Sequence, residues 1–198
     1  MKEVLISIKP KWCELIASGK KTVEVRKTKP KLETPFKVYI YETLGKTKWC
    51  NTCKDPCERP YPNCACHEGW GKVIGEFVCD KIVKFENSLF DEALRETVAR
   101  SCVPMYDLLV YIGKQDYGYG WHIRDLVIYD KSRELSEFYQ KGKNDANYYC
   151  DYCGGCVHHE TPVNEHPCNE CDGNRNYLCR PPQSWCYVEN AEPRQMAD

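Results

Sequence analysis

The chain has 198 residues, of which 42% are hydrophobic and 29% charged, a balance typical of one folded domain with sizeable insertions. No apolar run is long enough to predict a signal peptide or a membrane span, so an integral membrane protein is not expected. The net charge is only −1, but residues 1–50 hold 12 Lys and Arg against 5 Asp and Glu, and this predicts a locally basic surface.

The start of the chain predicts a strand, a helix and two further strands. Residues 2–9 (KEVLISIK) have the composition of a strand, and Pro10 then suits the first turn of a helix that ends at Gly19. Apolar and polar residues alternate in residues 22–26 (TVEVR) and 36–42 (FKVYIYE). This period-two pattern is typical of strands, and we expect them to build an antiparallel sheet.

The second half continues this sheet and adds two helices. Residues 72–85 (KVIGEFVCDKIVKF) alternate over their whole length and predict one long strand. Helical spacing marks residues 88–100 and 104–112, after which residues 119–130 (YGWHIRDLVIYD) again predict a strand. Residues 183–189 (QSWCYVE) predict the closing strand.

Two stretches lose the alternation and become rich in Cys, Pro, Asn, Gly and His. They are residues 43–71, insert one, and residues 141–180, insert two. Loops of this length without an apolar core need another source of order. We therefore expect one domain over residues 1–190, interrupted by two cysteine-rich inserts and followed by a loose tail at 191–198.

The cysteines of insert two predict a metal site. The chain has 15 cysteines and no predicted export signal, so reduced thiols in the cytoplasm are expected to bind metal in preference to forming disulfides. Two C-x-x-C units, each with a glycine shortly after it, supply Cys150, Cys153, Cys168 and Cys171. Four thiolates at this spacing can enclose one zinc ion tetrahedrally. Further candidate ligands are Cys156, His166 and Cys179.

Two alternatives to zinc stay open for insert two. Cys150, Cys153 and Cys156 follow part of a ferredoxin-type spacing, although Glu160 follows in place of the next cysteine. Unmetallated or disulfide-linked thiols are the other alternative.

Insert one predicts a second zinc site with a less regular pattern. Its expected ligands are Cys50, Cys53, Cys57 and Cys66, and Cys64 and His67 lie close to them in the sequence. Sites made mainly of thiolates are normally closed and structural, without the open coordination position that catalysis requires. We therefore expect one or two structural zinc ions that hold the inserts.

Residues 19–26 (GKKTVEVR) resemble the G-x-K-x-x-E-x-R signature of the ASCH domain, a branch of the PUA-like proteins. Residues 119–123 (YGWHI) and 181–187 (PPQSWCY) support the resemblance and are similar to a phage and prophage subgroup. The resemblance implies an α+β fold, a mostly antiparallel β-barrel of about six strands with peripheral helices. It also implies a cleft beside the first helix that suits RNA, a nucleotide or a modified nucleoside.

The signature itself supplies the expected binding residues. Alternation places Glu24 and Arg26 on one face of their strand. Arg26 can bind a phosphate with two parallel hydrogen bonds, Lys21 offers a point charge, and Glu24 can orient Arg26 or accept from a base amino group. A structural Glu–Arg pair on a solvated surface is the alternative. The predicted ligand-binding set is Lys20, Lys21, Glu24, Arg26, Trp121 and His122.

The resemblance also raises a hydrolase alternative. Some ASCH proteins remove the acetyl group from acetylcytidine with a Lys, a Thr nucleophile and a Glu, and Lys21 and Glu76 match two of these roles. Glu24 stands where the Thr is expected, and a carboxylate would give a reactive anhydride instead of an ester. A nuclease that uses Glu24, Glu76 and His122 as acid or base stays open, as does a protein-interaction module built on the zinc loops.

Overall fold

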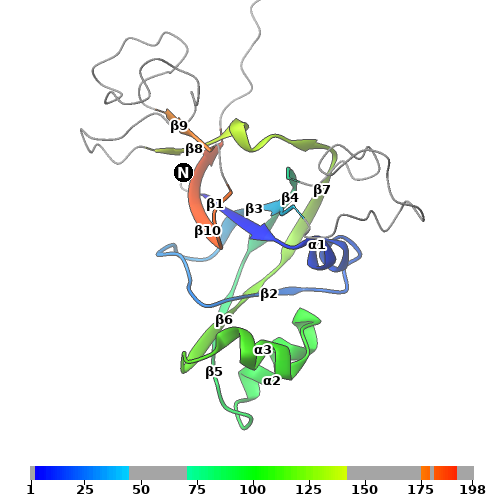
Figure 1. Ribbon diagram of the computed structural model, residues 1–198, viewed down its shortest axis with the longest axis vertical. Helices are drawn as coiled ribbons and strands as arrows, with labels where there is room; N and C mark the ends of the chain where they lie inside the picture. The colour runs from blue at the N-terminus through cyan, green and yellow to red at the C-terminus, as the bar shows by residue number, and fades with distance from the viewer. Residues whose placement is uncertain (1–2, 45–70, 142–174, 179–180, 191–198) are drawn as a thin grey trace, which may run out of the picture.

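The computed structural model describes residues 3–44, 71–141, 175–178 and 181–190, which form an α+β fold (Figure 1). The helices are α1 (Pro10–Ala17), α2 (Glu92–Ser101) and α3 (Met105–Ile112), with a short 3₁₀ turn η1 (Leu135–Glu137). The strands are β1 (Glu3–Ile8), β2 (Val23–Arg26), β3 (Phe36–Glu42), β4 (Val73–Cys79), β5 (Ile82–Glu86), β6 (Tyr117–His122), β7 (Arg124–Arg133), β8 (Phe138–Lys141), β9 (Arg175–Tyr177) and β10 (Trp185–Asn190). Among these residues, no helix has the length and apolar character that crossing a membrane requires.

The larger sheet has the strand order β7-β4-β3-β1-β10-β8-β9. Within it β1 and β3 pair in parallel and the other described pairs are antiparallel, which confirms the predicted predominance of antiparallel pairing. The two outermost strands on one side, β8 and β9, were not expected from the sequence. β9 lies within the range assigned to insert two.

The smaller sheet has the order β2-β6-β5 and carries α2 and α3 on one face. Gly118 and Gly120 of β6 make this packing close. A Cβ atom at Gly118 would lie 2.6 Å from Ile112 of α3, and one at Gly120 would lie 3.0 Å from Thr97 of α2. In Figure 1, α2 and α3 lie with β5 and β6 at one end of the molecule, away from β8 and β9.

The expectation of a closed barrel is wrong for the described strands. The long strand predicted over residues 72–85 is divided at residues 80–81 into β4 and β5, and these pair in different sheets. The strand predicted over residues 119–130 is divided in the same way at Ile123 into β6 and β7. Because both chain segments leave one sheet for the other, the described strands form two sheets with open edges. Alternation of side chains continues through such a bend, so the sequence pattern does not reveal it.

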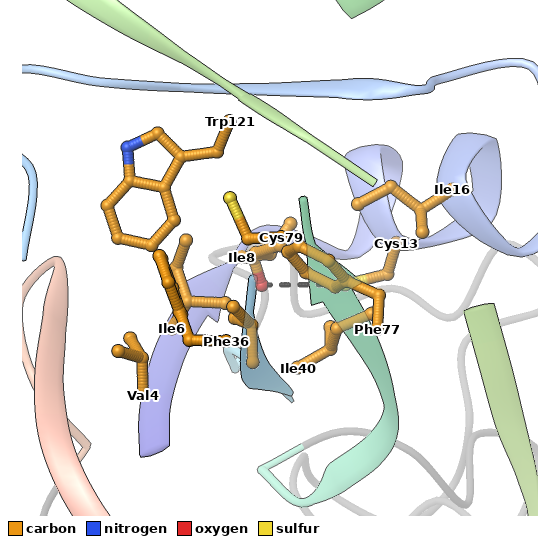
Figure 2. Close-up of a cluster of buried hydrophobic side chains, with 11 residues drawn as sticks. Val4, Ile6, Ile8, Cys13, Ile16, Phe36, Ile40, Phe77, Cys79 and Trp121 are labelled. Carbon is orange, nitrogen blue, oxygen red and sulfur yellow. Dashed lines mark hydrogen bonds between the residues drawn. The ribbon is translucent and has the colours of Figure 1, made fainter. Parts of the chain in front are cut away.

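The main core lies between the larger sheet and α1 (Figure 2). Alternate residues of β1, β3 and β4 point into it, and Cys13 and Ile16 of α1 cover them. Trp121 of β6 is fully buried here, with its ring centroid 5.9 Å from that of Phe36 in an edge-to-face arrangement. The core therefore fixes β1 and α1 in place beside the edge strand β2.

Candidate functional site

A cavity of about 590 Å³ opens beside the edge strand β2, and we call it the β2 pocket. Its walls come from the end of β1, α1, β2, α3 and the segment before β10. Trp12 of α1 together with Leu108 and Tyr111 of α3 makes much of the lining apolar. The volume lies within the range of small-molecule sites, which combine apolar walls with a few directed polar groups.

Three buried charged side chains line this pocket. Lys21 Nζ lies 3.1 Å from Glu24 Oε2, and Arg26 Nη2 lies 3.1 Å from Glu24 Oε1. The side chains of Lys21, Glu24 and Arg26 are 1%, 7% and 10% exposed, respectively. Each carboxylate oxygen therefore faces its own cation, which offsets the cost of removing these charges from water.

The donors of Lys21 are all engaged. Its ammonium group has three N–H bonds. They point to Glu24 and to the carbonyl oxygens of Val23, at 2.9 Å, and Ser101, at 2.8 Å. Lys21 thus ties β2 to the end of α2 and contributes a fixed positive charge to the pocket. No N–H is left for a ligand unless one of these bonds opens.

Arg26 keeps donors available. Its Nη2 donates to the Ser7 carbonyl at 2.6 Å and contacts Glu24. Among the residues that the structure describes, Nε is buried without a hydrogen-bond partner, and no partner is found for Nη1. A guanidinium offers five N–H bonds, and a buried donor that stays unpaired costs free energy. Because Arg26 lines the pocket, a ligand oxygen bound there can accept a hydrogen bond from Nη1.

The local sequence explains how this cluster forms. Helix α1 ends at residue 17, and Gly19 takes a left-handed backbone with φ +72, which favours glycine. The backbone N–H of Lys21 then donates to the Leu15 carbonyl at 2.9 Å and fixes the turn into β2. Side chains alternate along β2, so Glu24 and Arg26 point to one face of the strand and Val25 points to the other.

Of the other predicted binding residues, the pocket contains none. Lys20 is exposed and does not line the cavity, and Trp121 is buried in the core. His122 lies in a separate small crevice, where its Nε2 is 3.1 Å from Arg100 Nη1. Burial, together with the Arg100 charge, lowers the pKa of His122.

Glu76 lies on the opposite face of the larger sheet from α1. It stands beside Tyr39 in the β3–β4 register, whereas Phe77, the next residue, points into the core under α1. Tyr129 donates to Glu76 at 2.6 Å and Lys37 Nζ lies at 2.9 Å. The structure therefore does not bring Glu76 together with Lys21 and Glu24.

Several pocket residues were not expected from the sequence. The sequence placed Trp12 only within the first predicted helix, and Asp107 and Tyr111 only within the helix predicted over residues 104–112. Lys21 Nζ lies 5.3 Å from the Trp12 ring centroid, so the ring borders the charged cluster. The exposed polar and aromatic residues on the otherwise apolar α3 were a usable signal, but only the fold shows that they meet β2.

All eight predicted metal ligands, Cys50, Cys53, Cys57, Cys66, Cys150, Cys153, Cys168 and Cys171, lie outside the described residues. The cysteines within the described part are Cys13, Cys79, Cys102 and Cys186. No group of three or more metal-ligating side chains occurs in that part. The zinc sites thus stay predictions.

Comparisons with known proteins agree with the signature in residues 19–26. The profile described as the ASCH domain matches residues 6–150. The crystal structure of ASCH from Zymomonas mobilis is similar with a TM-score of 0.52 and 18% identity, over 94% of this chain and 87% of that one. A serine-to-alanine point mutant of the same Zymomonas mobilis protein gives 0.51 and 15% identity, over 94% and 88%. No curated protein matches. With more than half of its length matched by the profile, the chain belongs to the ASCH-domain family, which is PUA-like in fold.

Proposed function

We propose that this ASCH-domain protein binds a nucleotide, free or as part of RNA, in the β2 pocket. The observation that carries the proposal is the buried Lys21–Glu24–Arg26 cluster beside a cavity, in which Arg26 has N–H donors without a partner in the described part of the chain. Membership of a family that generally binds RNA supports the same class of ligand.

The pocket's chemistry suits the two parts of a nucleotide. The cluster carries one net positive charge, from two cations and one carboxylate, and the fork of Arg26 is suited to an anionic or carbonyl oxygen. Trp12 and the 40%-exposed Tyr111 supply flat apolar surfaces on which a base can stack. A purely apolar ligand would leave the Arg26 donors unsatisfied.

Binding without turnover is favoured over hydrolysis. The hydrolase alternative needs Glu76 near Lys21 and Glu24, but Glu76 lies on the other face of the larger sheet. His122, the further acid or base considered for a nuclease, does not line the β2 pocket. The interaction-module alternative depends on the inserts, which lie outside the described residues.

Calorimetric titration of the four nucleoside monophosphates tests the proposal. Arg26→Lys keeps the charge but removes the planar guanidinium and its paired N–H donors. We expect this change to weaken binding by about 10-fold or more, which corresponds to the loss of one to two charge-assisted hydrogen bonds. Lys20→Ala is the matched control, since this neighbouring lysine lies outside the pocket, and it should change affinity less than about 2-fold. Equal losses in both variants, with both folded by circular dichroism, would contradict the proposal.

We also propose that structural zinc holds the two inserts and that the protein works in the cytoplasm, where thiols stay reduced. The paired C-x-x-C units of insert two support this. Elemental analysis of protein purified without added metal should give one to two zinc ions per chain. Cys153→Ser should remove one ion and leave the melting of the sheet core unchanged, because the metal acts locally. Protein with unoxidised thiols and almost no zinc would refute this part.

A further inference from the structure

A row of side chains leads out of the β2 pocket across the smaller sheet. In the antiparallel registers, Arg26 of β2 is directly opposite Tyr119 of β6, and Tyr119 is directly opposite Lys84 of β5. Directly opposed residues on neighbouring strands share a face and stand roughly 5 Å apart. Arg26, Tyr119 and the exposed Lys84 therefore occupy adjacent positions on the same face of the smaller sheet.

Lysines accompany tyrosine rings along this line. Lys29 Nζ lies 6.0 Å from the Tyr119 ring centroid, and Lys84 Nζ lies 4.2 Å from that of Tyr117. The Tyr117 and Tyr119 rings are 5.7 Å apart, and Tyr117 is 37% exposed. A further pair lies beside the pocket, on the α3 side of β2, where Lys27 Nζ is 5.2 Å from the ring of Tyr111, which itself lines the β2 pocket. We call these six residues the lysine–tyrosine strip: Lys27, Lys29, Lys84, Tyr111, Tyr117 and Tyr119.

The lysine-bearing segment after β2 is held in place by β10. Trp185 Nε1 donates to Thr28 Oγ1 at 3.0 Å, and the Lys31 backbone N–H donates to the Tyr187 hydroxyl at 2.6 Å. Thr28 thus lies between Lys27 and Lys29 and anchors both. A surface ordered in this way loses less conformational entropy when a ligand binds than a free loop would.

We propose that the lysine–tyrosine strip binds single-stranded RNA, whose chain continues from a nucleotide held in the β2 pocket. This inference rests on the proposed function of that pocket. Alternating cations and rings suit a single strand, because the lysines follow the phosphates while unpaired bases stack on the rings. A duplex keeps its bases stacked on each other and offers no such faces, and an acidic protein segment would use the lysines without the tyrosines. Glu86 and Asp116, next to Tyr117 in the register and the sequence, mark the end of the strip.

Affinity as a function of RNA length tests the strip. Fluorescence anisotropy with labelled random-sequence RNA of 3, 6 and 9 nucleotides is compared with calorimetry on the nucleoside monophosphates. We expect the hexamer to bind at least 10-fold more tightly than a monophosphate. The triple variant Lys27→Ala, Lys29→Ala, Lys84→Ala should abolish this gain and lower the slope of log affinity against log salt by about 2, at roughly 0.7 per lysine. Tyr117→Ala should cost about 5-fold or more for the hexamer alone, the value of one stacked base.

The control variant removes three lysines in or next to the larger sheet, Lys37, Lys72 and Lys131. Lys37 also lies near a tyrosine ring, with 5.7 Å between Nζ and the Tyr39 centroid, so the control preserves the charge count and, at this one lysine, the proximity to a ring. If monophosphates bind but affinity does not increase with RNA length, the role of the strip is refuted and the proposed function of the pocket is not. A length gain in which Arg26→Lys has no effect would instead overturn the pocket. Equal losses in the two triple variants, or displacement of the hexamer by polyglutamate as readily as by unlabelled RNA, would reduce the effect to diffuse charge and refute the strip.

Discussion

Two clusters of this protein contain a lysine, a glutamate and a third polar group, and they lie on opposite sides of the larger sheet. In the β2 pocket, Lys21 and Glu24 are 3.1 Å apart with side chains 1% and 7% exposed. On the far face, Lys37 and Glu76 are closer, at 2.9 Å, but their side chains are 39% and 23% exposed. The shorter ion pair is thus the more solvated one.

The difference shows that burial next to a cavity separates the two clusters, whereas the ion-pair distance does not. Solvated pairs contribute little, because water screens them and side-chain freedom is lost when they form. Buried pairs are costly to desolvate and strongly destabilising to break, so they persist where something requires them. The proposed nucleotide site would supply such a requirement in the β2 pocket, where Arg26 Nε has no hydrogen-bond partner among the described residues.

Loss of the pocket glutamate should change stability more than any other substitution considered for the two clusters. Glu24→Leu leaves Lys21 and Arg26 buried without their counter-charge and should lower the free energy of unfolding by about 3–5 kcal/mol. Glu76→Leu is the matched change on the far face and should cost about 1 kcal/mol. Urea denaturation of both variants measures the two losses. Similar losses would show that the clusters do not differ as described.

The sequence led to the charged cluster and, through the family resemblance, to a cleft beside the first helix, but it did not reveal the pocket's walls. Strand periodicity correctly placed Glu24 and Arg26 on one face, because β2 is short and regular. Trp121 and His122 were predicted to belong to the same site. In the structure, Trp121 is buried in the main core and His122 contacts Arg100. Whether two residues of neighbouring strands reach the same site depends on which strands pair, and strand pairing is not determined by the local sequence.

For the fold, too, the sequence predicted single elements well and their long-range arrangement poorly. The residue composition of β1 and the alternation along β3 located them almost to the residue. The bends at residues 80–81 and at Ile123 were missed, because a strand that changes sheet keeps its alternation. The closed barrel was wrong for this reason.

A buried carboxylate without a cation provides a third case beside the two clusters. Among the described residues, Glu42 at the end of β3 has no ion-pair partner, and burial, with a further contribution from Glu14, raises its pKa from 4.5 to about 7. The folded state holds this proton longer than the unfolded chain does. Stability should therefore fall as pH rises from about 4.5 through 7. Glu42→Gln should remove this fall and be more stable than the unmodified protein at pH 8, measured by thermal denaturation at a series of pH values. A variant that is less stable at pH 8 would contradict the assignment.

The far-face glutamate should show the opposite pH dependence, with a smaller amplitude. Burial alone would raise the pKa of Glu76, but the hydrogen bond from Tyr129 and the Lys37 charge outweigh it and lower that pKa. Its contribution is present above the unfolded pKa and is lost as pH falls through the folded value. Glu76→Gln should therefore lower the free energy of unfolding by less than about 1 kcal/mol at pH 7. In acid, the stability of this variant should approach that of the unmodified protein. A constant difference over the acid range would rule out this linkage.

The protein is not expected to remove the acetyl group from acetylcytidine. Glu24 occupies the position expected for the nucleophile, and Glu76 lies on the wrong side of the sheet to assist Lys21. Chromatographic detection of cytidine should therefore show no enzyme-dependent release. Turnover that disappears in Glu76→Gln would contradict the separation of the two clusters.

A crystal structure of the protein soaked with the nucleoside monophosphate that binds most tightly in the titrations would locate the ligand itself. We expect density in the β2 pocket, with a phosphate or carbonyl oxygen within about 3 Å of Arg26 Nη1 and the base against Trp12 or Tyr111. The Lys21–Glu24 pair should stay intact, because Lys21 has no donor to spare. Nucleotide density elsewhere, with the β2 pocket filled only by solvent at saturating concentration, would contradict the proposed binding site.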